Sequence, residues 1–258
     1  MFIVGIGPGG PDHLSFRARE VLSQVEAVAG YTTYIELIAS LVEGKHIIKT
    51  GMKKEVDRVN AALDTALSGE TCAVVSSGDP GIYAMASLVF EALKIRGVMP
   101  VRPGETALNG QDALMVEVVP GIPALSAGAS LLGAPLSHDF AVISLSDLLT
   151  PWEMIEKRVH AAAEADFVIV IYNPKSKKRN WQLEETKDIV MKYRDPKTPC
   201  GVVTAAMRDD QKTEIVYLED LGKADVAMQT IVFIGNSASA AYGDYIITPR
   251  GYAKKYDI

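Results

Sequence analysis

Runs of consecutive apolar residues alternate with helical repeats of apolar positions through the first half of the chain. The runs, which consist mostly of Val, Ile and Ala, lie at residues 2–4, 27–29, 47–48, 71–75 and 114–119. Such runs are typical of buried strands. After the run 71–75, apolar residues recur at Ala84, Leu88, Ala92 and Ile95, the spacing of one helix face. This alternation over residues 1–135 predicts a mostly parallel sheet with helices on its faces.

The pattern changes near residue 136. Further strand-like runs lie at residues 140–145, 166–172, 199–204, 214–218 and 230–235, and a shorter one at 245–248 reads as an edge strand. Helices are predicted at 152–163 and 181–193, but little helix separates the last strands, which favours a mixed sheet. We therefore expect two α/β domains, residues 1–136 and 137–258, with the ligand cleft between them.

Two stretches of the first domain are less regular. Residues 98–112 are rich in Pro and Gly and predict a loop. Ser15 precedes the helical repeat that contains Val21 and Leu22, and we expect its hydroxyl to cap that helix.

Composition narrows the class of protein. The 258 residues are 48% hydrophobic and carry a net charge of −6, which argues against a general nucleic-acid binder. No apolar run reaches membrane-spanning length and no signal-peptide pattern opens the chain, so we expect a cytoplasmic protein. The two cysteines, Cys72 and Cys200, lie in apolar runs and are predicted to be reduced core thiols. The four histidines lack metal-ligand spacing, and no metal site is expected.

A glycine-rich loop follows the first predicted strand. Its sequence, Gly5-Ile-Gly-Pro-Gly-Gly10, fits a dinucleotide-binding pattern formally. Pro8 and Pro11, however, remove N–H donors that a pyrophosphate needs, and no acidic residue follows the run 27–29 to hold a ribose. Both observations disfavour a nicotinamide cofactor.

A second loop, Ser77-Gly-Asp-Pro-Gly81, follows the strand 71–75. Loops at the carboxyl ends of strands are where open α/β sheets bind ligands. The alternative is an ordinary turn between strand and helix, in which Asp79 serves only as a turn or cap residue.

Three stretches occur in this order: Gly5-Ile-Gly-Pro-Gly9, Ser77-Gly-Asp-Pro-Gly-Ile-Tyr83 and Val119-Pro-Gly-Ile122. Over the whole chain they resemble the tetrapyrrole methylase family, the S-adenosylmethionine-dependent enzymes of sirohaem and corrinoid synthesis. Within that family, residues 138–153 and 171–179 resemble the members that methylate carbon 17 of precorrin-3B or cobalt-factor III in cobalamin biosynthesis and contract the ring.

The resemblance implies a homodimeric α/β enzyme that binds S-adenosylmethionine and a tetrapyrrole. The implied donor-binding residues are Pro8, Gly78, Asp79, Ile82, Pro123, Ala124, Asn173, Ala206 and Thr230. Many relatives carry Ser or Thr at the position of Pro123, and Met at the position of Asn173. The amide of Asn173 would place a polar group near the donor.

Methyl transfer from a sulfonium to a ring carbon needs few titratable groups, because the leaving group is neutral. Ring contraction adds proton transfers, for which His138 and Asp139 at the predicted domain junction are the catalytic candidates. A structural bridge at the hinge is the alternative role for this pair.

A polycarboxylate substrate requires a local cationic site on an acidic protein. We expect Tyr83, Ser176 and Arg179 to bind the substrate, and Arg179 offers a bidentate fit to a carboxylate. The neighbouring lysines 175, 177 and 178, and the group Lys53, Lys54 and Arg58, could instead be solvated charges.

Three other functions remain open from the residues alone. The first is a methylase of the same fold whose substrate is another precorrin, a protein side chain or RNA. The second is a dinucleotide-dependent oxidoreductase, and the third is a binding protein without turnover.

Overall fold

The computed structural model describes residues 1–105, 112–176 and 179–257. Contacts divide the chain into two compact units, Met1–Ala124 and Leu125–Ile258, and each is described by itself. The 3₁₀ helices are η1 (Pro11–His13), η2 (Ala39–Leu41), η3 (Leu218–Lys223) and η4 (Tyr252–Lys254). Within the described residues, no helix is both long and apolar enough to cross a membrane.

The first unit is built on a five-stranded parallel sheet. Its order is β3 (His46–Thr50), β2 (Ala27–Tyr31), β4 (Cys72–Ser76), β1 (Phe2–Gly5) and β7 (Glu117–Val119). All neighbouring pairs are parallel, as the alternating pattern predicted. Strand β1 lies between β4 and β7, so the loops that follow these three strands leave the sheet at the same edge.

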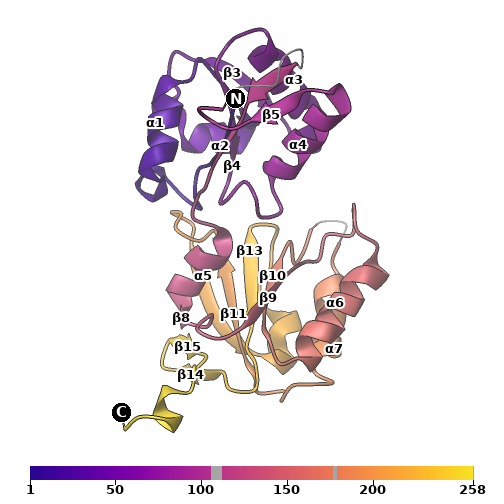
Figure 1. Ribbon diagram of the computed structural model, residues 1–258. Helices are drawn as coiled ribbons and strands as arrows, with labels where there is room; N and C mark the ends of the chain where they lie inside the picture. The colour runs from indigo at the N-terminus through magenta and orange to yellow at the C-terminus, as the bar shows by residue number, and fades with distance from the viewer. Residues whose placement is uncertain (106–111, 177–178, 258) are drawn as a thin grey trace. The chain divides into compact units, whose positions relative to one another are not determined.

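Helices cover both faces of this sheet (Figure 1). They are α1 (Phe16–Gln24), α2 (Thr32–Leu37), α3 (Glu55–Leu67) and α4 (Met85–Arg96). Leu63 of α3 and Leu93 of α4 pack in one apolar core, and Leu22 of α1 and Ile35 of α2 pack in the other. Ser15 caps α1 as predicted, since its hydroxyl accepts a hydrogen bond from the Ala18 N–H at 3.1 Å.

The prediction of one strand over residues 114–119 is wrong, because this segment forms two strands with different partners. β6 (Ala113–Met115) pairs with β5 (Met99–Val101), which lies in the stretch predicted to be a loop. At Val116 the N–H still donates to the Val101 carbonyl at 2.9 Å, and the Glu117 N–H then donates to Met1 at 3.1 Å. Residues 106–111 of the predicted loop lie outside the described residues.

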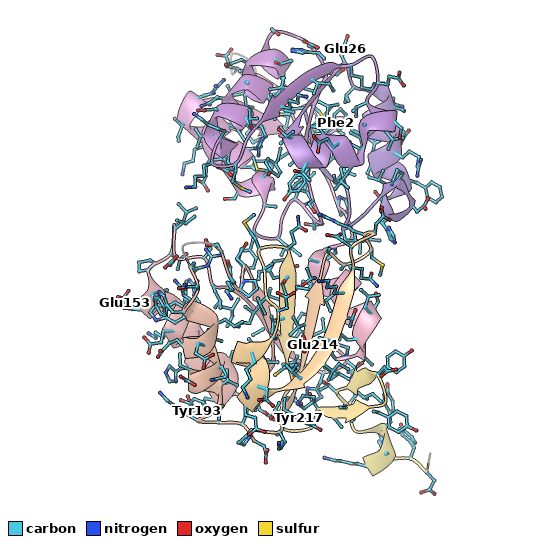
Figure 2. All side chains as sticks on the ribbon, turned by 180° about the vertical axis from the view of Figure 1, so that it is seen from behind. Phe2, Glu26, Glu153, Tyr193, Glu214 and Tyr217 are labelled. Atoms are coloured by element: carbon cyan, nitrogen blue, oxygen red, sulfur yellow. The ribbon has the colours of Figure 1, made fainter. Side chains whose placement is uncertain are left out.

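The second unit holds a mixed five-stranded sheet, as predicted. Its order is β12 (Lys212–Tyr217), β11 (Pro199–Thr204), β13 (Thr230–Ile234), β10 (Val168–Tyr172) and β9 (Phe140–Ser144). Only β9 and β10 are parallel neighbours. Helices α6 (Trp152–Glu164) and α7 (Gln182–Val190) cover one face. Figure 2 labels Glu153 and Tyr193 on this helical side, and Glu214 and Tyr217 on the edge strand β12.

Helix α5 (Ala124–Leu132) packs on the other face of the second sheet (Figure 1). A Cβ atom at Gly128 would lie 2.9 Å from the Phe233 ring, and one at Gly201 would collide with the Leu132 side chain. These two glycines let the helix approach the strands closely. The expected boundary at residue 136 therefore differs from the observed division at Ala124, because α5 packs with the second unit.

The predicted edge strand near the end of the chain belongs to a separate sheet. β15 (Tyr245–Ile247) pairs with β14 (Ala240–Tyr242) and with β8 (Gly133–Ala134) rather than with the main sheet. Ile246 of β15 is buried. The Thr248 and Ser239 hydroxyls, 2.7 Å apart, fix its end.

Candidate functional site

Three loops meet at the carboxyl edge of the first sheet. The loop after β1 bonds to the loop after β4, because the N–H of Ile6 donates to the Ser76 carbonyl at 2.9 Å. Gly7 and Gly78 then exchange hydrogen bonds of 3.2 and 2.8 Å. The third loop, after β7, comes to the same place through Gly121. The three stretches that carry the family resemblance are thus adjacent in space.

This junction requires glycine at its centre. A Cβ atom at Gly5 would lie 2.6 Å from both the Gly121 nitrogen and the Gly78 oxygen. A Cβ atom at Gly121 would overlap the same Gly78 oxygen. Gly78 itself has a φ of 66°, a left-handed conformation that glycine adopts without strain. Backbone meets backbone here, which leaves peptide N–H and C=O groups to define the edge.

Asp79 ties two of these loops together. Its Oδ1 accepts a hydrogen bond from the Gly81 N–H at 2.8 Å, and its Oδ2 accepts one from the Gly121 N–H at 3.2 Å. The loop-fixing role considered from the sequence is therefore present. A carboxylate offers about four acceptor positions, so Asp79 retains capacity for a ligand.

The junction brings together the donor-binding residues predicted in the first unit. Pro8 follows the Gly7 bridge and is buried, and Ile82 follows Asp79 in the loop after β4. Pro123 and Ala124 lie beside Gly78, where a Cβ atom would be 3.7 Å from the Pro123 Cα and the Ala124 nitrogen. Tyr83, predicted to contact substrate, is 55% exposed at the end of the same loop.

The second sheet has a comparable carboxyl edge. Asn173 follows β10, Ala206 follows β11, and Thr230 begins the antiparallel strand β13, so all three lie at one edge. The Thr230 Oγ1 lies 2.7 Å from the Thr204 Oγ1 and accepts a hydrogen bond from the Ala227 N–H at 2.9 Å. The predicted donor-binding residues of the second unit are therefore grouped as well.

Arg179 lies buried at this edge, with 8% of its surface exposed. Its Nη2 donates to the Asn173 carbonyl at 3.0 Å and its Nη1 to the Ser146 hydroxyl at 3.4 Å. The Ser176 N–H donates to the Arg179 carbonyl at 2.7 Å. Burial lowers the pKa of the Arg179 guanidinium, and the charge of Asp147 opposes that shift. No ion pair joins Arg179 to a carboxylate among the described residues, and lysines 177 and 178 lie outside them.

Several polar residues of this edge were not predicted from the sequence. They are Ser144, Ser146, Asp147 and Gln182. The Asn173 amide donates to the Ser144 hydroxyl at 2.9 Å, and the Gln182 amide donates to Asp147 Oδ2 at 2.9 Å. Within the described residues, Gln182 Oε1 and Arg179 Nε are buried without a hydrogen-bond partner. A signal existed for Asp147, since it lies in the stretch 138–153 that resembles part of the family.

Left-handed backbone is concentrated at these two edges. Among the described residues, the non-glycine residues with positive φ are Lys53, Tyr83, Asp166, Asn173, Ala205 and Met207. All but Asp166 lie in loops that follow the carboxyl ends of strands. Strained backbone of this kind is often retained at ligand-binding sites.

His138 and Asp139 lie elsewhere in the second unit. They precede β9, whereas the Arg179 group follows β9 and β10, so the length of a strand separates them, about 13 Å. The His138 side chain is 46% exposed, and that of Asp139 is 80% exposed. The structure does not bring this pair together with the other predicted site residues, and its catalytic role stays a prediction. Within the described residues, no group of three His, Cys, Asp or Glu side chains is placed to share a metal ion.

Comparison with known families identifies the pattern. The family model of tetrapyrrole (corrin/porphyrin) methylases matches residues 1–222. The chain belongs to the tetrapyrrole methylase family. Enzymes of this family use S-adenosylmethionine as the methyl donor.

Individual relatives of this tetrapyrrole methylase match 96% or more of its length. It is 46% identical over 258 residues to the cobalt-factor III methyltransferase of Priestia megaterium, but spans only 46% of that protein's length. It is 43% identical to the probable cobalt-factor III C(17)-methyltransferase of Salmonella typhimurium, covering 97% of this chain and 98% of the relative. The crystal structure of the methyltransferase CobJ matches with a TM-score of 0.85 and 36% identity, covering 96% of this chain and 98% of CobJ.

Proposed function

We propose that this protein transfers a methyl group from S-adenosylmethionine to carbon 17 of a corrinoid precursor, cobalt-factor III or precorrin-3B, with ring contraction. The reaction would serve cobalamin biosynthesis. The observation that carries the proposal is the likeness to the Salmonella relative, 43% identical over nearly the full length of both chains. The junction of Gly5, Gly78 and Gly121 supports it, because it places the family's three loops at one sheet edge.

The chemistry suits the groups found at the two edges. The electron pair of a ring carbon attacks the sulfonium methyl, a carbon–carbon bond forms, and the methyl–sulfur bond breaks with its electrons going to sulfur. S-adenosylhomocysteine leaves neutral at sulfur, so no acid is needed for departure. The protein has to align the reactants and exclude water. Peptide groups and neutral side chains are sufficient for that task.

The residues of the first edge fit a donor that carries a sulfonium and an adenosine. Pro8, Gly78, Ile82, Pro123 and Ala124 present backbone and small or apolar groups and carry no charge themselves. Asp79 supplies a carboxylate beside them, held in place by two backbone N–H groups. At the second edge we assign Asn173, Ala206 and Thr230 to the same ligand.

Substrate binding is assigned to Tyr83, Ser176 and Arg179. A tetrapyrrole of this class carries several carboxylates, and a buried guanidinium whose hydrogen-bond partners among the described residues are neutral is suited to bind one. Ser176 holds the Arg179 backbone from both sides, through bonds of 2.7 and 3.1 Å.

We also propose a homodimer that works in the cytoplasm. A hollow of about 540 Å³ lies between β12, α5 and the small sheet, lined in part by Leu131, Ile215 and Tyr245. Tyr245, which lines the hollow, is 54% exposed, and Tyr242 of the neighbouring strand β14 is 76% exposed. Exposed aromatic groups are common at protein interfaces. Light scattering of the wild type and of a Tyr242→Asp/Tyr245→Asp variant would test this assignment. A monomeric wild type would contradict it.

A product mass spectrum tests the reaction itself. The purified protein would be incubated without oxygen with S-adenosylmethionine and, in parallel, with cobalt-factor III or precorrin-3B. We expect one ring to gain the mass of one methyl group while S-adenosylhomocysteine is released. Two stable rings without mass gain, in the presence of bound donor, would contradict the proposal and favour another methylase activity or a binding protein.

The same assay addresses His138 and Asp139. If they transfer protons during ring contraction, His138→Ala would accumulate a methylated ring that has not contracted. A contracted product formed at the wild-type rate would contradict that role.

A further inference from the structure

Arg58 of helix α3 is a buried cation that the proposed mechanism does not use. Only 3% of its surface is exposed. Its Nε donates to the Thr50 hydroxyl at 2.9 Å and its Nη2 to the Gly51 carbonyl at 3.3 Å. Its Nη1 lies 3.7 Å from the Met85 sulfur. All three partners are uncharged.

No carboxylate pairs with this guanidinium among the described residues. Glu55, one turn earlier in α3, exerts an opposing charge but makes no ion pair with Arg58, and its Oε1 accepts a bond from the Lys53 N–H. Burial lowers the pKa of Arg58, so the environment disfavours the charge it carries. A buried charge in a protein is normally paired.

Two other arginines of this chain are buried, and they allow a comparison with Arg58. Arg194 also has a buried guanidinium, but it makes an ion pair of 2.9 Å with Asp166. Arg58 and Arg179 lack such a partner within the part of the chain that the structure describes, and both lie where strands of a sheet end at its carboxyl edge. The missing counter-charge is thus a property of the edges that carry the predicted ligand-binding residues.

The place of Arg58 in the first unit supports a ligand-binding role. Thr50 ends β3, and the tyrosine pair of Tyr31 and Tyr34, with ring centroids 5.2 Å apart, lies where the neighbouring strand β2 ends. Met85 begins α4 immediately after the loop that carries Asp79 and Tyr83. The guanidinium therefore contacts two of the segments that form this edge.

We propose that Arg58 binds a carboxylate of a ligand. The inference rests on the proposed function, which supplies two such ligands: the tetrapyrrole with its acid side chains, and the donor with its amino-acid carboxylate. Arginine binds carboxylates through two parallel N–H groups, and burial strengthens that pairing. The tetrapyrrole is the favoured source, because it carries several carboxylates whereas the donor carries one.

Two variants and a control test the inference by binding, without turnover. Arg58→Met removes the charge and keeps most of the volume, and Arg58→Lys keeps the charge without the paired N–H groups. Arg96→Met is the control, since Arg96 lies in the same unit and already pairs with Asp64. Calorimetry would measure the affinity for S-adenosylhomocysteine, and absorbance titration the affinity for cobalt-factor III. Thermal unfolding would report the stability of each variant.

We expect Arg58→Met to weaken tetrapyrrole binding at least about tenfold, with a smaller loss in Arg58→Lys and none in Arg96→Met. Loss confined to S-adenosylhomocysteine would assign the donor carboxylate instead. Unchanged affinity for both ligands, with or without lower stability, would overturn the inference and make Arg58 a structural brace. If Arg58→Met does not fold, unchanged binding by Arg58→Gln would overturn it equally. A wild type that binds both ligands but transfers no methyl group would contradict the proposed function while leaving these titrations decisive.

Discussion

Two buried arginines, one at each end of the second sheet, differ in the partners they have. At the end where β10 begins, Arg194 donates to the Ala163 and Phe167 carbonyls and pairs with Asp166. Asp166 in turn accepts two hydrogen bonds from Ser237, at 3.0 and 2.5 Å. At the end where β10 finishes, the Arg179 guanidinium has only a carbonyl and a hydroxyl as hydrogen-bond partners among the described residues.

This difference distinguishes a buried arginine that stabilises the fold from one that is available to bind a ligand. The Arg194 end satisfies its charge within the chain, and removing one member should cost stability. Among the described residues Arg179 forms no ion pair, and only the nearby charge of Asp147 opposes the effect of its burial, so removing Arg179 should cost binding. Both arginines are equally buried, at 8% exposure, so burial alone does not distinguish the two roles.

The largest expected effect is on activity at the Arg179 end. Arg179→Met should lower kcat/KM for the tetrapyrrole about a hundredfold, because the carboxylate loses a charge-assisted partner. The free energy of unfolding should stay the same or rise, since a buried charge that forms no ion pair among the described residues is removed. Steady-state kinetics and urea unfolding measure the two quantities. A clear loss of stability with normal kinetics would show that Arg179, like Arg194, has a structural role, and would contradict the distinction between the two ends.

The matching change at the other end is Asp166→Asn. It leaves Arg194 buried without its counter-charge and should lower the free energy of unfolding by about 2 kcal/mol. This figure is below that of a fully buried pair, because the Asp166 side chain is 42% exposed. Urea unfolding measures the loss, and S-adenosylhomocysteine affinity should not change. Weakened ligand binding with full stability would contradict the structural assignment.

The pH dependence of that stability loss is a smaller effect. Burial acts to raise the pKa of Asp166, but hydrogen bonds from Ser237 and the charges of Arg194 and His138 together bring it below its usual range. Because the native pKa is depressed, the Asp166 carboxylate stabilises the folded state at pH values above the unfolded pKa of about 3.9. That stabilisation is lost as the pH falls through the native pKa. The difference between wild type and Asp166→Asn should therefore be full at neutral pH and shrink below about pH 4. A difference that does not vary between neutral pH and pH 3 would show that the carboxylate charge is not the cause.

The smallest expected effect is that of His138→Ala on methylation. Because His138 precedes β9, about a strand length from the Arg179 end, the rate of methyl transfer should stay within about twofold of wild type. The appearance of S-adenosylhomocysteine with time measures it. A large loss would place His138 in the methylation machinery and contradict the separation of the two ends.

Much of this fold could be predicted from local sequence. The apolar strands and the helix repeats around them specified a parallel first sheet and a mixed second one, because each pattern reports the burial of its own segment. The partner change at Val116 could not be predicted, since it depends on which distant strand accepts each hydrogen bond. The packing of α5 likewise depends on Gly201, which lies far along the chain from Gly128.

The candidate site likewise contains residues that could be predicted from local sequence and residues that could not. Gly78 and Asp79 were found because glycine and aspartate after a strand have a local meaning, and the family motif covers them. Gln182 was missed because its role depends on Asp147, 35 residues earlier. His138 was chosen for its place near a predicted boundary, and the contacts put the boundary at Ala124 instead.

The two buried thiols make this chain suitable for site-specific labelling. Cys72 and Cys200 are buried and unpaired, and burial raises the pKa of each to about 12, so neither forms much thiolate at pH 7. Maleimide probes should therefore ignore both in the folded protein. New cysteines at exposed positions, such as Lys94 and Lys157, would accept a pair of spin labels or fluorophores without removal of the native ones. Distance measurements between such labels would then record how ligands affect the separation of the two units.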